Sequence, residues 1–312
     1  MPSRSPTTPA ASTGPIAPGA TTLGPARNAV GAGDGIDPVA GTGSTGASAT
    51  TPPPVDVVIL TWNDGELLDR AVASCRASVG VDVRLIIVDN GSSPPAEVDG
   101  PVTLIRNDVN RGVAAGRNQG IAAGTSPFVC LLDSDAELRP GSLARLVDEL
   151  ASTGAALVVP VFEDQAPEAS AGRAPNAGRK VARMLGRSGR YAPSPGRHPG
   201  AGSWPVEFGI GACQVFHRAG WSEVGGIDES FFYGPEDVDF CLRILDAGGT
   251  VRQVAAAPVL HPPRRRHRRP VDTAGLRHGW AIVRYLVRHR RRLHGRLHGR
   301  LHHRPAGNGT AR

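Results

Sequence analysis

The chain has 312 residues, of which 40% are hydrophobic, so it can bury the core of one large domain or two small ones. Its four cysteines lie apart without a C-x-x-C pair, which argues against a disulfide framework and favours buried free thiols in a reducing compartment. The net charge of +7 is uneven: residues 264–312 hold 15 arginines and one acid, a formal +14, which leaves −7 for the rest. A basic tail on an acidic body indicates an anionic partner surface, either acidic lipid or nucleic acid.

Three regions follow from composition. Residues 1–54 consist mainly of small residues and proline and predict a disordered leader, because they cannot bury enough apolar surface to offset the entropy of ordering. The leader lacks the apolar core of a signal peptide, and no run of the chain reaches the roughly 18 apolar residues of a membrane span. Residues 55–262 predict a folded α/β domain, and residues 263–312 predict a basic helical tail.

Strands and helices alternate through the first half of the domain. Apolar runs predict strands at residues 55–60, 83–88, 102–106, 128–132 and 157–161. Helical spacing predicts a helix that begins after an Asp64 N-cap, a small-residue helix at 112–123 and an amphipathic helix at 142–150. Such alternation with short connections predicts βαβ units and a mostly parallel central sheet flanked by helices.

The pattern breaks at residues 163–204, which are rich in Gly, Pro, Ala and Arg and predict a mobile or substrate-facing segment. Order returns at 211–217, followed by a helix at 236–247 and a strand at 254–260. The tail then offers a helix with Leu276, Trp280, Val283 and Val287 along one stripe, and a Leu-His-Gly-Arg repeat. This stripe fits either a helix lying on a membrane surface or a helix packed on the protein's own core.

Asp133 and Asp135 follow directly after the apolar run at 128–132. Residues two apart in an extended chain point to the same side, so both carboxylates should meet beyond the carboxyl end of a buried strand. Paired oxygen ligands suit Mg²⁺ or Mn²⁺ together with substrate phosphates. The alternative is a loop turned by two solvated aspartates.

Two further segments stand near predicted strand ends. Asp89 begins an Asp-Asn-Gly-Ser-Ser stretch and either accepts hydrogen bonds from a base or ribose or forms a simple turn. Residues 110–120 are glycine-rich and either let the backbone approach a phosphate or let a helix pack closely. Their spacing matches neither a dinucleotide fingerprint nor a P-loop.

The segment 231–243 places three aromatic residues before a Gly-Pro break, after which Glu236 and Asp237 open a helix. Carboxylates in a first helical turn are favoured by the helix dipole alone. Aromatic rings beside a carboxylate also suit sugar stacking and general base catalysis.

Five motifs carry a resemblance: Thr-Trp-Asn at 61–63, Val-Asp-Asn-Gly-Ser at 88–92, the Asn-Arg-Gly to Asn-Gln-Gly segment at 110–120, Asp-Ser-Asp at 133–135 and the aromatic motif at 231–240. In this order they resemble a family 2 glycosyltransferase of the GT-A fold, closest to the bacterial rhamnosyltransferase-like branch. The resemblance covers about residues 55–261.

The resemblance implies roles for matching positions. The nucleotide-sugar pocket would be lined by Thr61, Asn63, Asp89, Arg111, Asn118, Asp133 and Gly211. Asp133, Asp135 and His261 would hold Mg²⁺ or Mn²⁺, and Asp237 would be the catalytic base beside Glu236.

The implied reaction is inverting, metal-dependent transfer of a sugar from a nucleotide-diphosphate donor, dTDP-rhamnose or a UDP-sugar, to a glycan or lipid-linked acceptor in cell-surface polysaccharide synthesis. The expected location is cytoplasmic, with the tail able to hold the enzyme on the anionic inner face of the cell membrane. The alternative function is a non-catalytic polyanion-binding protein that uses the basic tail, with nucleic acid the less favoured partner.

Overall fold

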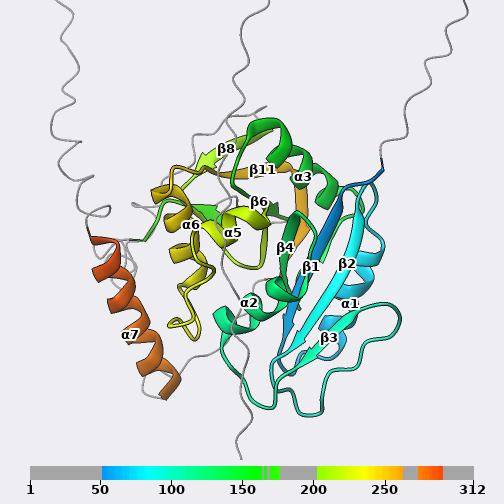
Figure 1. Ribbon diagram of the computed structural model, residues 1–312, viewed down its shortest axis with the longest axis horizontal. Helices are drawn as coiled ribbons and strands as arrows, with labels where there is room; N and C mark the ends of the chain where they lie inside the picture. The colour runs from blue at the N-terminus through cyan, green and yellow to red at the C-terminus, as the bar shows by residue number, and fades with distance from the viewer. Residues whose placement is uncertain (1–50, 164, 167–168, 176–201, 263–272, 291–312) are drawn as a thin grey trace, which may run out of the picture. The chain divides into compact units, whose positions relative to one another are not determined.

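The computed structural model describes residues 51–163, 165–166, 169–175, 202–262 and 273–290 (Figure 1). Its strands are β1 (Pro54–Thr61), β2 (Asp82–Asp89), β3 (Thr103–Arg106), β4 (Phe128–Asp133), β5 (Glu137–Leu138), β6 (Leu157–Phe162), β7 (Ala171–Gly172), β8 (Ser203–Val206), β9 (Phe208–Gly209), β10 (Cys213–His217) and β11 (Val251–Leu260). Its helices are α1 (Glu66–Arg76), α2 (Val113–Ala123), α3 (Ser142–Thr153), α5 (Arg218–Glu223), α6 (Glu236–Asp246) and α7 (Thr273–Arg288). The predicted leader, apart from its last residues, and the Leu-His-Gly-Arg repeat lie outside the described residues.

The central sheet is mixed. Its strand order is β3-β2-β1-β4-β10-β6-β11-β5, with β8 added along β11. The pairs β1–β2, β1–β4, β2–β3 and β6–β11 are parallel, whereas β10 runs antiparallel to both β4 and β6. The predicted α/β class with a mostly parallel sheet is therefore confirmed, and the reversal of β10 is a feature that the alternation of strands and helices did not reveal.

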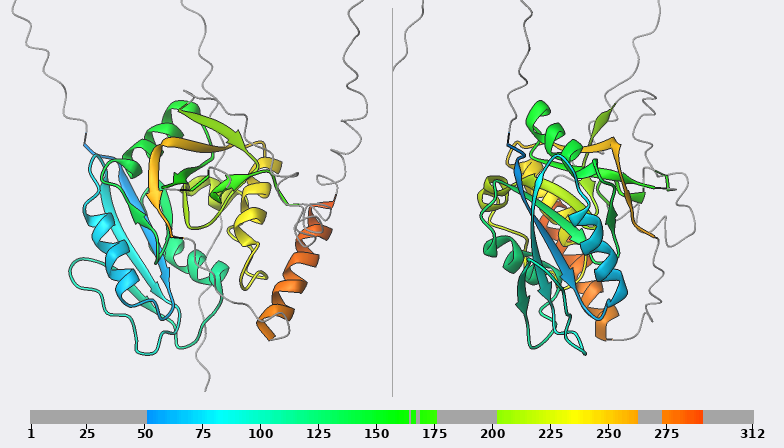
Figure 2. Two further views of the ribbon diagram at one scale, coloured as in Figure 1. Left: turned by 180° about the vertical axis from the view of Figure 1, so that it is seen from behind. Right: turned by 90° about the vertical axis from the view of Figure 1, so that its right-hand side faces the viewer.

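Helices cover both faces of this sheet (Figures 1 and 2). Helices α1 and α3 pack on one face, and α2 and α6 pack on the other. Helix α7 lies outside α6 and shares a third apolar cluster with it. The buried strands read as continuous apolar runs because helices cover them on both sides.

Close packing explains the small residues of α2. A Cβ on Gly116 would lie 2.4 Å from Leu60, and one on Gly120 would lie 2.4 Å from Val58. The interpretation of residues 110–120 as a closely packed helix is confirmed, because both glycines let α2 approach β1.

One local prediction is wrong. Helix α1 begins after Gly65, not after an Asp64 N-cap, and the Asp64 carboxylate instead accepts a hydrogen bond from Ser134 Oγ at 2.5 Å. Within the segment 163–204 the structure describes β7 and the start of β8, most of the rest lies outside the described residues, and its role facing the substrate stays a prediction.

Three residues of the predicted apolar stripe of α7 face away from the protein. Trp280, Val283 and Val287 are 75%, 50% and 56% exposed, while Ala281 and Tyr285 are buried among residues 278–288 of the helix. The alternative in which this stripe packs on the core is therefore wrong for these three residues. Among the helices described, none is both long and apolar enough to cross a bilayer.

All four cysteines are free and buried, as expected. Cys75, Cys130 and Cys213 belong to the apolar cluster between the sheet and helices α1 and α3, whereas Cys241 belongs to the cluster under α6. Burial raises the pKa of the Cys75 and Cys241 thiols to about 12.

Candidate active site

The ends of three neighbouring strands meet at one edge of the sheet. Thr61 pairs with Asp89 across β1 and β2, and Leu60 pairs with Asp133 across β1 and β4. The carboxyl ends of parallel strands are where open α/β sheets bind ligands. Thr61 is buried, and its hydroxyl has no hydrogen-bond partner among the described residues, so a polar group of a ligand would satisfy it.

Asp133, Asp135 and His261 form a three-residue cluster at this edge. One ligand atom from each lies within 4.8 Å of the others, and His261 Nε2 is 3.5 Å from Asp135 Oδ1. His261 arrives directly after β11, far from the aspartates in sequence. Two carboxylates and an imidazole fit Mn²⁺ or Mg²⁺ in ligand type, so the donor set suits the metal that the sequence predicts.

Arg117 is a site residue that the sequence analysis missed. It is 5% exposed, and its Nη2 donates to Asp133 Oδ1 at 2.7 Å and to the Gly211 carbonyl at 2.8 Å. Its Nη1 lies 3.5 Å from Glu236 Oε1. Burial alone would lower the pKa of Arg117, but the surrounding carboxylates raise it, so the guanidinium stays charged.

Asp133 combines a metal-ligand position with this ion pair. Desolvation raises its pKa, Arg117 opposes the rise, and the Asp135 carboxylate adds to it. Because 37% of the Asp133 side chain is exposed, solvent screens these charges and keeps the carboxylate available to a ligand.

Gly211 connects the cluster to Asp237. The Gly211 N–H donates to Asp237 Oδ2 at 3.0 Å, while its carbonyl accepts from Arg117. A second backbone bond, from Val238 N–H to Asp237 Oδ1 at 2.8 Å, fixes the other oxygen. Asp237 is half-buried at the start of α6, so the first turn of this helix faces the strand ends.

Glu236 differs sharply from its neighbour Asp237. It is 6% exposed, and its Oε2 has no hydrogen-bond partner in the part of the chain that is described. Burial raises the pKa of Glu236 to about 7, the charge of Asp237 adds to the rise, and Arg117 opposes it. Glu236 lies against Arg117, and its catalytic role beside Asp237 stays a prediction.

Asp89 organises the turn after β2. It is 2% exposed, and its two oxygens accept from the backbone N–H groups of Ser92 and Ala96 at 2.9 and 2.8 Å. Asn63 braces the same turn: its N–H donates to Ser92 Oγ at 2.9 Å, and its Oδ1 accepts from Ser93 N–H at 2.7 Å. These contacts agree with the interpretation of Asp89 as a residue that forms the turn. A contact between Asp89 and a nucleotide base stays a prediction.

Asn118 and Arg111 lie away from the metal-ligand cluster. Asn118 bonds both backbone groups of Ile227, the Trp221 indole and Glu229, at 2.7 to 3.0 Å, and so fastens α2 to the segment after α5. With Arg111 it lines an open groove of about 590 Å³ that none of the cluster residues lines. Their contact with the ribose or diphosphate stays a prediction, and Arg117 is the residue of this segment that reaches Asp133.

The aromatic motif divides between core and surface. Phe231 is fully buried, which corrects the expectation of three stacking rings, while Phe232 and Tyr233 are 38% and 44% exposed. The Phe232 carbonyl accepts from the Val113 N–H at 2.7 Å, so this loop lies over the N-terminus of α2. Gly112 allows the approach, because a Cβ there would lie 2.8 Å from Phe232.

Comparison with known proteins decides the family. Residues 56–220, just over half of the chain, match the family described as Glycosyl transferase family 2. The chain belongs to glycosyl transferase family 2. The predicted resemblance to this family is thus confirmed.

Two curated relatives of this chain come from Mycobacterium tuberculosis. A pre-mycofactocin glycosyltransferase is 33% identical over 224 residues, covering 67% of the chain but only 43% of the relative. An N-acetylglucosaminyl-diphospho-decaprenol L-rhamnosyltransferase is 29% identical over 235 residues, covering 66% of the chain and 75% of the relative. The chain thus spans less than half of the first relative's length.

Solved structures share the fold of this chain at low identity. GalNAc-T7 with UDP, GalNAc and Mn²⁺ matches with a TM-score of 0.54 and 17% identity over 70% of this chain and 46% of that one. The mannosyltransferase PcManGT from Pyrobaculum calidifontis, in complex with GDP-Man and Mn²⁺, matches with a TM-score of 0.50 and 18% identity over 70% and 59%. The central sheet is therefore that of the GT-A fold.

Proposed function

We propose that this protein transfers a sugar from a nucleotide-diphosphate donor to an acceptor hydroxyl, with inversion at the anomeric carbon. The observation that carries the proposal is the meeting of the Asp133–Asp135–His261 cluster with Asp237 at one edge of the sheet, bridged by Arg117 and Gly211. A charge-binding centre for a diphosphate thus lies beside a half-buried carboxylate that can accept a proton.

Asp237 acts as the general base. It takes the proton of the acceptor hydroxyl while that oxygen forms a bond to the anomeric carbon. The bond from this carbon to the diphosphate oxygen breaks at the same time, and the nucleoside diphosphate leaves with the electron pair. One displacement by one base inverts the configuration, in contrast to retaining enzymes with a second carboxylate nucleophile.

Asp133, Asp135 and His261 are the residues that would hold Mg²⁺ or Mn²⁺. A divalent ion bound there would neutralise charge on the departing diphosphate. Arg117 keeps one Asp133 oxygen engaged at 2.7 Å and so fixes the orientation of that carboxylate. Thr61, at the end of β1, offers an unsatisfied hydroxyl to the nucleotide.

The relatives favour particular substrates. A rhamnosyltransferase among them supports dTDP-rhamnose as donor, a UDP-sugar is the rival, and the GDP-Man complex of a structural neighbour adds a third candidate. The name of the same rhamnosyltransferase, which includes a diphospho-decaprenol, supports a lipid-linked acceptor, and a relative named for succinoglycan biosynthesis supports cell-surface polysaccharide as the product.

The exposed side of α7 supports the proposal that the protein acts at the cytoplasmic face of a membrane. Trp280, Val283 and Val287 share one side of this helix with exposed Arg284. Apolar side chains flanked by cations suit an interfacial helix, and further arginines follow in sequence at 290–292. We propose an anionic lipid surface as the partner of this side.

Purified full-length protein with Mn²⁺ tests the proposed reaction. It is incubated with dTDP-rhamnose, UDP-galactose, UDP-galactofuranose, UDP-N-acetylglucosamine and GDP-mannose, each with a polyprenyl-diphosphate-linked acceptor, and product is read by mass spectrometry. We expect one donor to be used and its use to stop with EDTA. No turnover of any donor, together with no nucleotide-sugar binding in calorimetry, would overturn the proposal.

A further inference from the structure

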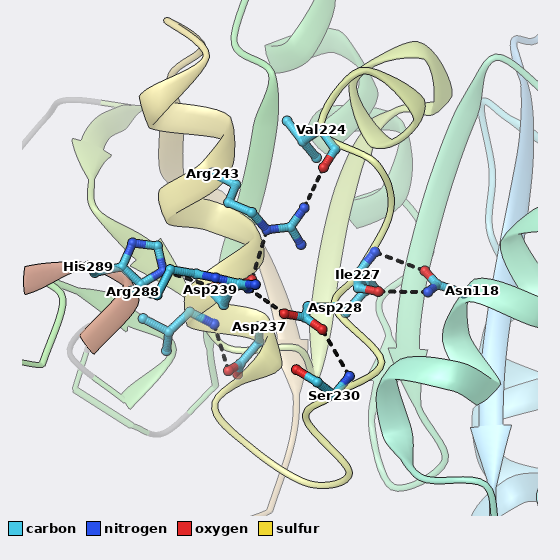
Figure 3. A network of polar contacts seen from close by, with 11 residues as sticks. Asn118, Val224, Ile227, Asp228, Ser230, Asp237, Asp239, Arg243, Arg288 and His289 are labelled. Carbon is cyan, nitrogen blue, oxygen red and sulfur yellow. Dashed lines mark hydrogen bonds and ion pairs between the residues drawn. The ribbon is translucent and has the colours of Figure 1, made fainter. Parts of the chain in front are cut away.

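Helices α6 and α7 both lie beyond residues 56–220, the part of the chain that matches the family, and α7 is tied to α6, which bears Asp237. Figure 3 shows Arg288, the last residue of α7, and His289, which follows it, converging on Asp239, two residues after Asp237 on α6. The contacts are both polar and apolar. Both kinds join α7 to α6 and to the aromatic loop before it, residues 231–233.

The polar contacts centre on Asp239, whose side chain is fully buried. His289 Nε2 lies 2.8 Å from its Oδ1, Arg288 Nη1 lies 3.1 Å from the same oxygen, and Arg243 Nε donates to Oδ2 at 2.8 Å. Burial alone would raise the pKa of Asp239, but these hydrogen bonds hold it below its ordinary value. The buried Asp239 carboxylate holds these three side chains in place. The loss of any one of them would leave part of the carboxylate's charge uncompensated.

Arg288 carries the connection one step further. The same Nη1 pairs with Asp228, whose Oδ1 accepts from the Ser230 N–H at 2.9 Å. Asp228 and Ser230 precede the aromatic loop directly, so one arginine of α7 spans the loop and α6. His278, in the first half of α7, lies with its Nδ1 3.2 Å from the Tyr233 carbonyl.

The apolar contacts lie on the same side of α7. Tyr285 is fully buried in a cluster with Phe231, Val238, Leu242 and Ala281. Its hydroxyl donates to the Pro175 carbonyl at 2.9 Å, which satisfies the polar end of the buried ring. Val238 is the residue between Asp237 and Asp239, so the packing of α7 bears on the first turn of α6.

We propose that α7 is a positioning element of the active site, with His289 and Arg288 holding Asp239 so that Asp237 keeps its orientation toward the metal-ligand cluster. The inference rests on the proposed function of Asp237. The chain after the last strand of the sheet thus completes the catalytic apparatus. His289 and Arg288 are positioning residues that act through Asp239, because Asp237 itself is held by backbone N–H groups of Gly211 and Val238.

The first test needs no substrate. Hydrogen exchange of residues 228–240 is compared in wild type, His289→Ala and Arg288→Gln, with Mn²⁺ affinity measured in parallel. We expect both variants to speed exchange in this stretch and to leave Mn²⁺ affinity unchanged, because the metal ligands lie at the end of β4, in the turn after it and directly after β11. Glu149→Gln is the matched control: it weakens the 3.0 Å pair of Glu149 with Arg252 elsewhere in the chain.

The second test uses the accepted donor. His289→Ala should lower kcat by about tenfold or more while the donor KM changes by less than about twofold, since only the base is misplaced. His289→Gln should recover part of kcat, because its Nε2 can still donate to Asp239. Arg288→Gln keeps the buried imidazole and carries the test even if His289→Ala does not fold.

The outcomes separate the two hypotheses. Wild-type exchange and wild-type kcat in folded His289→Ala or Arg288→Gln would overturn the positioning role. A wild type that uses no donor would overturn the proposed function, while the exchange data would still report whether α7 orders the first turn of α6.

Discussion

Gly211 and Arg117 fit together only because position 211 has no side chain. A Cβ there would lie 2.2 Å from Arg117 Nη1. We expect Gly211→Ala to push the guanidinium away from Asp133 and Glu236, to cost about 1–3 kcal/mol of unfolding free energy, and to reduce transfer. Urea denaturation and donor turnover measure the two effects. Gly220→Ala, with nothing within 4 Å of the added carbon, is the control, and equal behaviour of the two variants would contradict the prediction.

Asp135→Asn should abolish tight Mn²⁺ binding, because a neutral amide replaces one of two carboxylates in a three-residue ligand set. Electron paramagnetic resonance of free Mn²⁺ during titration gives the affinity directly. Asp148→Asn removes an exposed carboxylate on α3 and should bind Mn²⁺ as wild type does. Retained affinity in Asp135→Asn would place the metal elsewhere.

Asp237→Asn should remove transfer while leaving donor binding intact. The amide oxygen can still accept one of the two backbone N–H groups that the carboxylate accepts, from Gly211 or from Val238, but no group remains to take the acceptor proton. We expect a loss of kcat of about 10²-fold or more. Single-turnover assays and calorimetry of donor binding separate the two steps, and full turnover by this variant would exclude Asp237 as the base.

Glu236 gives the stability a defined pH dependence. Its pKa lies at about 7 rather than the ordinary 4.5, so between these values the folded protein holds the proton more tightly than the unfolded chain. This contribution to stability is complete below pH 4.5 and disappears as the pH rises through 7. It amounts to about 3 kcal/mol at about 1.4 kcal/mol per pKa unit.

Replacing Glu236 by Gln should remove this dependence. The unfolding free energy of Glu236→Gln relative to wild type should therefore rise from pH 4.5 to 8, as measured by urea denaturation at each pH. Glu223→Gln, at an exposed position, should show no such trend. A constant difference for Glu236→Gln would mean that Glu236 titrates normally.

The exposed stripe of α7 predicts attachment to anionic vesicles. Trp280→Ser with Val283→Ser should reduce co-flotation with phosphatidylglycerol vesicles by about tenfold, because interfacial binding scales with buried apolar area. Deleting residues 291–312 should reduce it further through lost charge, at about 1 kcal/mol per arginine near the surface. Val79→Ser, at a position 59% exposed, is the apolar control, and wild-type flotation of the double variant would refute the lipid partner.

The sequence predicted strands at the positions of β1, β2, β3, β4, β6 and β11, because apolar runs mark them, but it did not predict the short strands β5 and β8 of the same sheet. It also predicted the meeting of Asp133 and Asp135 with His261, the last of these through family resemblance. The reversal of β10 escaped prediction, since a short apolar run carries no sign of its direction.

Arg117 escaped prediction for a different reason. Its partners Asp133, Gly211 and Glu236 lie 16 to 119 residues away, so only the fold brings them together. Neighbouring Asn118 carried the stronger motif signal, yet it points into the segment after α5. The docked side of α7 was equally hidden, because Tyr285 and His289, the residue after the helix, are buried there and a hydrophobic pattern marks neither.

The buried thiols allow unfolding of the protein to be followed by cysteine alkylation. Every cysteine of the chain is covered, and burial leaves the Cys75 and Cys241 thiols with a pKa of about 12, so a thiolate-directed alkylating reagent should modify the protein only as it opens. Cys241 lies under α6, while Cys75, Cys130 and Cys213 lie across the sheet beneath α1 and α3. Mass spectrometry after brief alkylation would thus tell, without any engineered label, whether the α6 layer detaches before the rest of the domain unravels.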